Sequence, residues 1–324
     1  MEYQEKNYTQ HLAPAPLFRD PVYDGAADPT IIWNRQEQCW WIVYTQRRAN
    51  LELPGVAYCH GSTLGIASSS DGGVSWLYRG VLRNLEFEPG QNTFWAPEIL
   101  WHEGRYHLYV SYIQGIPSEW RGTRRIVHMI SENLWDWHFV AILPLSSHYV
   151  IDACVYRLPS GIWRLWYKDE LHGSSTYAAD SPDLFHWTVV GPVISDFPHE
   201  GPNVFFWHGS YWLIIDEWHG LGVYRSSDAV TWTRQPGHLL EKPGTRLDDG
   251  TYGRHADVLV QGEHAYVFYF THPHEKTGEN SSNSLLYSAR QTSLQVAQLQ
   301  IEDDQLICPR NEVMLQLLPE SAVL

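Results

Sequence analysis

The amino-acid sequence predicts an all-β fold, a five-bladed β-propeller, on three observations. A short motif of the form S-x-D-x-x-x-W recurs along the chain, and a second motif, an acidic or polar residue followed by an apolar run, occurs five times. No long segment has the 3.6-residue apolar periodicity of an amphipathic helix. At 324 residues the chain is long enough to bury a sizeable core. We therefore expect residues 1–324 to form one propeller, with about the first 20 residues as an extended arm.

The first motif marks the end of each repeat. Its copies end at tryptophans roughly 45 to 60 residues apart, the size of a four-stranded propeller blade. These residues are Trp76, Trp137, Trp187 and Trp232. The Ser, Asp and Gly residues predict a tight turn, with the Trp on the strand that follows. The fifth copy, residues 285–294, lacks the Trp, which we expect where strands from both chain ends close the last blade.

The second motif marks the first strand of each repeat. Its copies read ADPTIIW, APEILW, IDACVYR, EGPNVFFW and RHADVLV, and each precedes a turn and another apolar strand. We expect the five strands to begin near residues 28, 95, 152, 200 and 255. The first strand of a propeller blade lines the central channel, so chemically active residues from separate blades should meet in one axial pocket.

Four carboxylates and one imidazole are expected in that pocket. They occupy the same part of the motif and are Asp28, Glu98, Asp152, Glu200 and His255. Any one of them could simply form a turn, but acids at one register of several repeats favour a functional site.

Composition narrows the classes of partner. The 37 acidic residues against 22 Lys and Arg give a net charge of −15, which disfavours nucleic acid and anionic membranes. The 16 Trp, 19 Tyr and 10 Phe suit stacking on sugar rings, although β-proteins also use them as core residues. The four cysteines are scattered, so neither a zinc knuckle nor a disulfide framework is predicted. The N-terminal residues have no apolar run, so we expect a cytoplasmic protein, or one exported by a route that the sequence does not show; nothing predicts the oligomeric state.

At these motifs the chain resembles the five-bladed propeller glycosidases of glycoside hydrolase family 43 and its relatives in families 32, 62, 68 and 117. The resemblance covers about residues 20 to 275 and rests on ADP, WAPE, VIDACV and EGPNVF in that order. It implies that Asp28 is the general base, Asp152 the orienting residue and pKa modulator, and Glu200 the general acid. The implied activity is exo-acting, inverting release of terminal sugars, such as α-L-arabinofuranosyl or β-xylosyl units, from oligosaccharides without a required cofactor.

The chemistry of glycoside cleavage supports this division of roles. One carboxyl group must be ionised while another is protonated at the same pH. A neighbouring Asp152 is expected to raise the pKa of Glu200 and keep its proton in place. Acids on opposite walls of a propeller pocket suit the separation of roughly 6.5–9.5 Å in inverting enzymes.

Further residues are expected to bind substrate. Phe94 and Trp95 precede the second inner strand and should form a stacking floor, unless they belong to the core. Glu98 is expected to bind substrate or act structurally, since Pro97 shifts its facing. Arg254 is a candidate donor to sugar hydroxyls or to Asp28, with a salt bridge as the alternative. The full set is Phe94, Trp95, Glu98, Arg47, His60, Trp218, Arg254 and His255.

Two departures keep other interpretations open. Residues 44–76 are longer and more polar than a plain blade needs, so Arg47, Arg48 and His60 could reach the pocket mouth. This part resembles family 117, whose members release 3,6-anhydro-galactose. His255 could be a core residue, a proton donor or a metal ligand, with a structural calcium in the central channel. A fructosidase, or a sugar-binding propeller without catalysis, would share the fold, but the latter has no need of the three acids.

Overall fold

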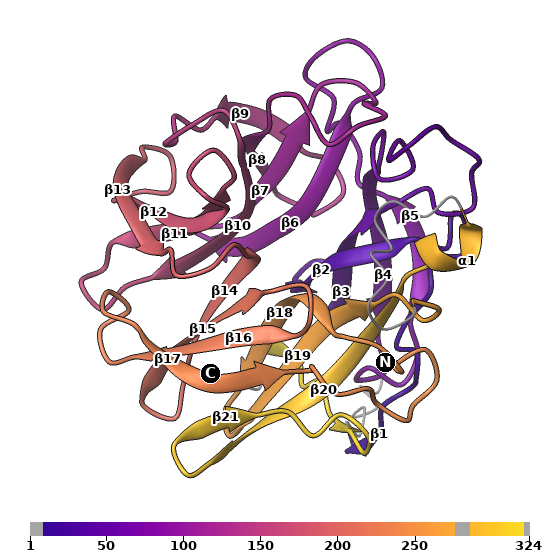
Figure 1. Ribbon diagram of the computed structural model, residues 1–324, viewed down its shortest axis with the longest axis vertical. Helices are drawn as coiled ribbons and strands as arrows, with labels where there is room; N and C mark the ends of the chain where they lie inside the picture. Colours follow the sequence, from indigo (N-terminus) through magenta and orange to yellow (C-terminus); the bar gives the residue numbers. More distant parts are fainter. Residues whose placement is uncertain (1–8, 276–285, 321–324) are drawn as a thin grey trace, which may run out of the picture.

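The computed structural model describes residues 9–275 and 286–320, and it is a five-bladed β-propeller (Figure 1). Five four-stranded sheets surround a central axis. The first blade comprises β2 (Ala26–Asn34), β3 (Cys39–Gln46), β4 (Thr63–Ser69) and β5 (Leu77–Val81). The second comprises β6 (Thr93–His102), β7 (Arg105–Ile113), β8 (Arg125–Ser131) and β9 (His138–Ile142). The third comprises β10 (Val150–Arg157), β11 (Trp163–Asp169), β12 (Ser175–Ser181) and β13 (Thr188–Ile194).

The last two blades follow the same order. The fourth comprises β14 (Glu200–Trp207), β15 (Ser210–Asp216), β16 (Leu221–Ser226) and β17 (Thr233–Leu239). The fifth comprises β18 (Arg254–Gln261), β19 (His264–Thr271), β20 (Ser293–Glu302) and β21 (Gln305–Ile307). A short helix, α1 (Tyr287–Arg290), precedes β20. The all-β fold, its five blades and the starts of the inner strands are confirmed. No helix in the described part of the chain is long and apolar enough to cross a membrane.

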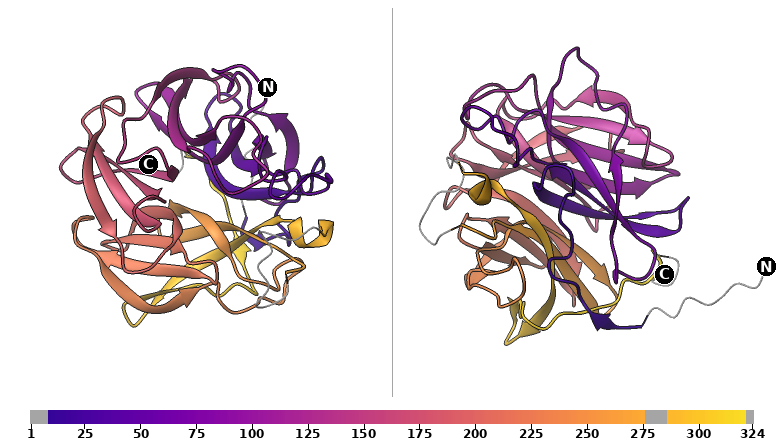
Figure 2. Two further views of the ribbon diagram at one scale, coloured as in Figure 1. Left: turned by 45° about the horizontal axis from the view of Figure 1, so that its top comes forward. Right: turned by 90° about the vertical axis from the view of Figure 1, so that its right-hand side faces the viewer.

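The chain closes outside the blades, which corrects the expected closure by mixed strands. All four strands of the fifth blade come from consecutive C-terminal segments. The N-terminal segment instead forms its own two-stranded sheet, β1 (His11–Leu12) with β22 (Met314–Leu315), alongside the propeller (Figure 2). A backbone bridge joins Phe18 to Leu294 of β20. The fifth copy of the first motif begins at Leu285, which lies outside the described residues.

The turn motif fixes the outer strand of a blade. In the third blade Asp183 accepts hydrogen bonds from the backbone N–H groups of Phe185 and His186, both at 2.9 Å. The Trp187 indole donates to the Leu184 carbonyl at 3.1 Å, which ties it to the turn. Trp187 therefore precedes β13 by one residue instead of lying on it. The Asp183 side chain thus accepts hydrogen bonds from the backbone N–H groups of the turn, as Asp commonly does.

The hydrophobic core lies between adjacent blades. Trp41, Trp137, Trp166 and Trp212 are fully buried. One apolar cluster contains Trp41 of the first blade together with Trp137 at the edge of the second. Much of the aromatic content is therefore structural, as β-proteins use it.

A β-bulge interrupts every inner strand near its start. The pairing register shifts after Ala27, Trp95, Ile151, Glu200 and Arg254, each time for two residues. The first bulged residue has positive φ in four blades, at Asp28, Ala96, Asp152 and Gly201. A bulge re-aims side chains and leaves backbone groups unpaired.

Below the bulges, side chains of the inner strands connect neighbouring blades. Asp257 accepts hydrogen bonds from the Ile31 N–H at 2.8 Å and the Asn203 amide at 2.9 Å. Glu98 accepts the Val155 N–H at 2.7 Å. Burial, which removes water from the carboxyl group, and the nearby Asp257 charge raise the pKa of Glu98 well above its usual value. This layer is structural.

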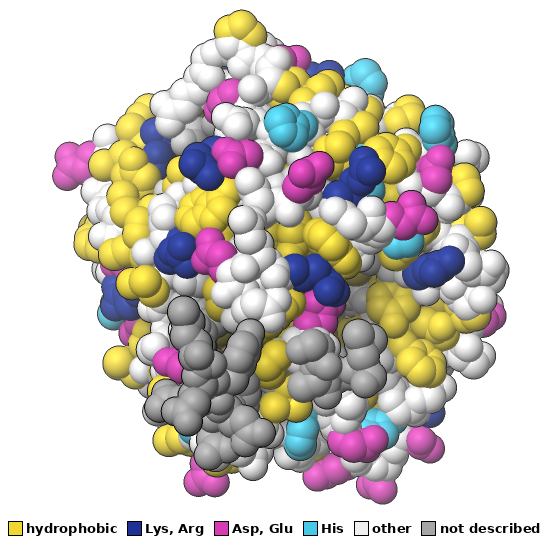
Figure 3. Space-filling view, turned by 180° about the vertical axis from the view of Figure 1, so that it is seen from behind, with side chains coloured by type: hydrophobic (Ala, Val, Ile, Leu, Met, Phe, Trp, Pro, Cys, Tyr) yellow, Lys and Arg dark blue, Asp and Glu magenta, His cyan; other side chains and the backbone are white. Residues whose placement is uncertain are grey.

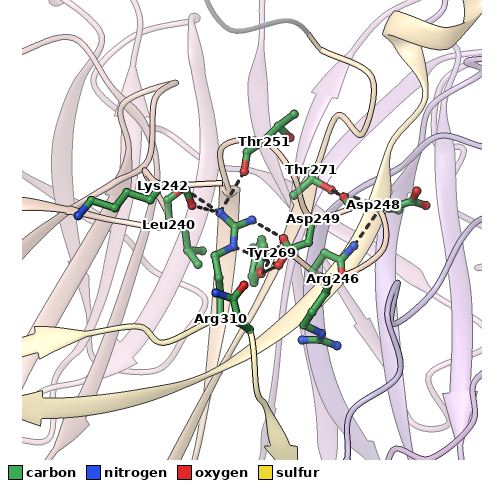
Figure 4. A network of polar contacts seen from close by, with 12 residues as sticks. Leu240, Lys242, Arg246, Asp248, Asp249, Thr251, Tyr269, Thr271 and Arg310 are labelled. Atoms are coloured by element: carbon green, nitrogen blue, oxygen red, sulfur yellow. Dashed lines mark hydrogen bonds and ion pairs between the residues drawn. The ribbon is translucent and has the colours of Figure 1, made fainter. Parts of the chain in front are cut away.

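A buried ion pair holds the C-terminal segment against the fourth and fifth blades (Figure 4). Arg310 contacts both oxygens of Asp249 and donates to the backbone carbonyls of Lys242 at 2.8 Å and Thr251 at 3.0 Å. The Tyr269 hydroxyl donates to the same carboxylate at 3.0 Å. Because every polar group here has a partner, removing one leaves a buried charge uncompensated.

Replacing Arg310 with Met is therefore expected to lower the free energy of unfolding by about 3–5 kcal/mol. The matched control is Arg83→Met, which removes the exposed pair with Asp136 and should cost only about 0–1 kcal/mol. Urea denaturation followed by circular dichroism measures both. Equal losses in the two variants would contradict the role assigned to Arg310.

Candidate active site

One cavity of about 820 Å³ lies on the propeller axis and is lined by residues from all five blades. Asp28, Asp152 and Glu200, expected to meet from three different blades, all line it. The other lining residues are Arg47, Tyr58, Cys59, Trp95, Trp120, Arg124, Ile151, Lys168, Glu170, Trp218, His219, Tyr252, Arg254, His255, Phe270, His272 and Glu275.

The acids do not share one register, which corrects the sequence interpretation. Asp28, Asp152 and His255 are the first bulged residues of their strands. Glu200 lies one position earlier, and Glu98 comes directly after its bulge. The bulges therefore bring Glu200 into the pocket and leave Glu98 in the layer below it.

Gly201 takes the first bulged position in the fourth blade, next to Glu200. Its φ is +56°, and an added Cβ would lie 2.9 Å from Cγ of the His255 ring. A side chain here would displace His255, so this position needs glycine both for its backbone conformation and for space.

The Arg47 guanidinium and the His255 imidazole face Asp28. Arg47 Nη2 lies 3.2 Å from Oδ1 and 3.3 Å from Oδ2 of this carboxylate. His255 Nδ1 lies 3.8 Å from Oδ1. The Arg47 guanidinium also stacks on Phe270, 4.8 Å from the ring centroid. These contacts compensate the charge of an ionised Asp28 and hold it in place.

Asp152 is fixed by a backbone donor and has an unusual proton affinity. Its Oδ2 accepts the Gly201 N–H at 3.1 Å. Burial raises the pKa of Asp152 to about 7; the Glu200 and Asp28 charges act in the same direction, and His255 and Lys168 oppose them. The same carboxylates raise the pKa of His255 against the effect of burial.

The expected rise in the pKa of Glu200 is wrong for the free pocket. Burial acts in that direction, but Lys168, His255 and a hydrogen bond from the Trp218 side chain together outweigh it and hold the pKa of Glu200 at about 2, with Lys168 contributing most. Lys168 Nζ donates to Oε2 at 3.0 Å. The sequence reasoning counted Asp152 and missed this ammonium. The two acids titrate as a pair, and near neutral pH their shared proton resides mainly on Asp152.

Aromatic side chains form two walls of the pocket. Trp95 and Trp120 lie on one wall with ring centroids 6.1 Å apart, and the Trp95 indole donates to the Cys59 carbonyl at 2.7 Å. Trp218, 39% exposed, lines the pocket from the end of β15, where the Asp216 carboxylate accepts its backbone N–H at 2.7 Å. Flat rings on two sides suit a sugar between them.

Several expected substrate contacts lie elsewhere. Phe94 is 1% exposed and packs against Tyr112 in the core between blades. His60 is buried behind Trp95, at 4.8 Å between ring centroids, and outside the lining. Arg48 donates to the carbonyls of His60 and Ala57, so it orders the loop and does not reach the cavity. The sequence of residues 44–76 does not indicate which side chains face the cavity and which ones hydrogen-bond within the loop.

Arg254 lines the pocket but does not contact Asp28. Its Nη2 lies 3.0 and 2.9 Å from the two oxygens of Glu275, so it forms the expected alternative, a salt bridge. The sequence analysis also missed Lys168, Glu170 and Trp120. Lys168 had a visible signal, since the strand WRLWYKD has a Lys one residue before its end, after the apolar run LWY.

Among the described residues, His255 belongs to no cluster of three or more His, Cys, Asp or Glu ligand groups, so a calcium ion beside it stays a prediction. Calcium takes six to eight oxygen ligands. Among residues 9–275 and 286–320, only Glu217, His219 and His238 bring three ligand groups close together, and His255 is not among them. Arg234 already occupies both oxygens of Glu217, at 2.6 and 3.0 Å. Below His255, the oxygens of Asp257 accept protein hydrogen bonds.

Charges of both signs are mixed on one face of the molecule. On the face opposite that of Figure 1, Lys and Arg side chains are interspersed with Asp and Glu (Figure 3).

The interaction of His255 with Asp152 can be tested directly. Replacing Asp152 with Asn is expected to lower the pKa of His255, because it removes the carboxylate that raises it most. NMR titration of the imidazole measures this, with Asp216→Asn, a weaker contributor, as the control. A His255 pKa unchanged by Asp152→Asn would contradict this electrostatic account.

Comparison with known proteins places this geometry among solved propellers. No family model matches the sequence, and no curated protein matches it. Solved structures do match in fold. A thermostable family 43 glycoside hydrolase superposes with a TM-score of 0.68 at 17% identity, covering 93% of this chain and 99% of that one.

Two further structures agree. A family 43 enzyme from Xanthomonas citri, complexed with xylotriose, gives a TM-score of 0.66 at 16% identity over 92% of this chain and 93% of that one. A β-xylosidase/α-arabinofuranosidase of family 43 from a compost microbial metagenome, also with xylotriose, gives 0.64 at 13% identity over 96% and 99%. The molecule is thus a five-bladed propeller with an acidic axial pocket. Its fold is that of the family 43 glycoside hydrolases.

Proposed function

We propose that this protein is an inverting, exo-acting glycoside hydrolase that releases terminal pentosyl units, such as β-xylosyl or α-L-arabinofuranosyl, from oligosaccharides. The observation that carries the proposal is the meeting of Asp28, Asp152 and Glu200, from three blades, in one cavity walled by tryptophans. The shared fold with family 43 hydrolases supports it, and so do two matched structures that hold xylotriose.

In the proposed reaction a water molecule attacks the anomeric carbon. Asp28 accepts a proton from this water, and Arg47 and His255 compensate its charge before the attack. The glycosidic C–O bond breaks, its electron pair goes to the leaving oxygen, and Glu200 donates a proton to that oxygen. The anomeric configuration is inverted in one displacement. The reaction requires no cofactor.

Glu200 must carry the proton when the bond breaks, although Lys168 disfavours this in the free site. The Asp152–Glu200 pair holds one proton below about pH 7. The reaction proceeds through the minor tautomer, in which the proton lies on Glu200. Because activity requires that the pair still holds this proton, the loss of activity at high pH follows the titration of the pair as a whole. Activity is therefore expected to fall as the pH rises through about 7.

A leaving-group comparison tests the roles of Glu200 and His255. A general acid contributes roughly 10²–10⁴-fold by protonating the departing oxygen. Glu200→Gln should therefore lose about that factor in kcat on a xylo-oligosaccharide and far less on a nitrophenyl glycoside, which needs little protonation. His255→Asn, the matched control, should reduce both substrates alike. The reverse pattern would transfer the donor role to His255 and favour the family 117-like alternative.

The stereochemistry of the first product tests the role of Asp28. NMR of early product is expected to show the inverted anomer, because water attacks directly from the face opposite the leaving group. Asp28→Asn should abolish activity on both substrate types. Retention of configuration, or a glycosyl group trapped on Asp28, would contradict the assignment of Asp28 as base.

A further inference from the structure

A repeated contact joins the second strand of one blade to the bulge of the next. The Thr45 hydroxyl accepts the Ala96 N–H at 2.8 Å, and the Ser111 hydroxyl accepts the Asp152 N–H at 2.9 Å. The Asp216 carboxylate accepts the His255 N–H at 2.9 Å. In each case an oxygen near the end of a second strand satisfies the unpaired donor of the neighbouring bulge.

Lys168 occupies the equivalent position in the third blade. It pairs with Ile151 across the sheet, as Thr45 pairs with Ala27 and Asp216 with Glu200. An ammonium group has three donors and no acceptor. Lys168 therefore cannot satisfy the N–H of the next bulge, which belongs to Gly201.

The presence of Lys168 in place of an acceptor changes the contacts of both Asp152 and Glu200. The Gly201 N–H is accepted by Oδ2 of Asp152 at 3.1 Å, which fixes that carboxylate. The Lys168 ammonium instead reaches Glu200, 3.0 Å from Oε2. With Lys168 in place of an acceptor, the Gly201 N–H is left to orient Asp152, and a cation lies beside Glu200.

A second anchor holds the ammonium in place. Lys168 Nζ lies 3.5 Å from Oε1 of Glu170, whose Oε2 lies 3.2 Å from Arg124 Nε. The ammonium also lies 5.5 Å from the centroid of the Trp218 ring, on the side of the aromatic wall. Lys168 is also buried, which shields its ammonium group from solvent.

We propose that Lys168 is a positioning residue of the active site: by replacing the hydrogen-bond acceptor found in the first, second and fourth blades, it orients Asp152 through Gly201 and determines which acid of the Asp152–Glu200 pair carries the shared proton. The inference rests on the proposed function only for its consequence in catalysis. The charged groups that act on Lys168, Asp152 or Glu200 are Asp28, Arg47, Glu170, His199, Asp216 and His255.

Two substitutions separate the charge of Lys168 from its missing acceptor. Lys168→Met removes the charge and adds no acceptor, whereas Lys168→Thr removes the charge and restores the hydroxyl found at Thr45 and Ser111. Lys168→Arg retains the charge and is the control. The whole protein carries ¹³C-labelled Asp and Glu carboxyl groups, assigned with Asp152→Asn and Glu200→Gln, and is titrated by NMR without substrate.

We expect Lys168→Met to raise the pKa of Glu200 by about 1–3, the effect of removing an adjacent opposite charge. Lys168→Arg should leave it low. Lys168→Thr should raise it too, and should in addition raise the pKa of Asp152 above its value in Lys168→Met, because Thr would take over the Gly201 N–H that favours the ionised form. In an active enzyme, the basic limb of kcat/KM should move to higher pH in Lys168→Met and stay in Lys168→Arg.

The titration decides the inference without any assay of activity. A Glu200 pKa unchanged in folded Lys168→Met would overturn the charge role, and identical Asp152 titration in the Met and Thr variants would overturn the role of the missing acceptor. If the wild-type protein cleaves no glycoside, the proposed function fails while the NMR result still stands.

Discussion

A bulged residue has a backbone N–H that its own sheet leaves unpaired, and inside a propeller that donor must find an acceptor. Here the neighbouring blade supplies it, through Thr45, Ser111 and Asp216. The same bulges turn side chains toward the axis. The contact that joins the blades is thus also the contact that shapes the pocket. The positions of the candidate catalytic residues therefore depend on the packing of the blades.

The third and fifth blades depart from this rule, with Lys168 and Phe270 at the equivalent position, and the charge of Lys168 changes the electrostatics of the site. With Lys168 in place of an acceptor, a carboxylate takes over the backbone donor and a cation enters the pocket. The cations of the cavity are paired with acids, such as Arg254 with Glu275 and Arg47 with Asp28. Pairing keeps the charges of the pocket nearly compensated inside a protein of net charge −15, so the acids remain close together without an unpaired buried charge.

The tryptophans serve both roles that composition left open. Trp41 and Trp166 fill the space between blades, whereas Trp120 and Trp218 are partly exposed at the cavity. Residue type cannot distinguish these roles, because the same flat apolar ring packs against a strand or against a sugar. Position in the fold decides: Trp95, beside the bulge of the second blade, and Trp218, just after β15, line the pocket, whereas Trp207, at the end of β14, belongs to the core.

By itself the sequence determined the blade number, the starts of the inner strands and the trio of Asp28, Asp152 and Glu200, because repeats and local strand patterns are written along the chain. The tertiary structure decided the rest. Phe94 and His60 were assigned to the pocket and lie outside it, since facing depends on bulges that no short pattern encodes. The proton affinity of Glu200 depends on Lys168, which is 32 residues away in the chain and 3.0 Å away in space. Electrostatic interactions depend on distance through space, and only the folded propeller establishes that distance.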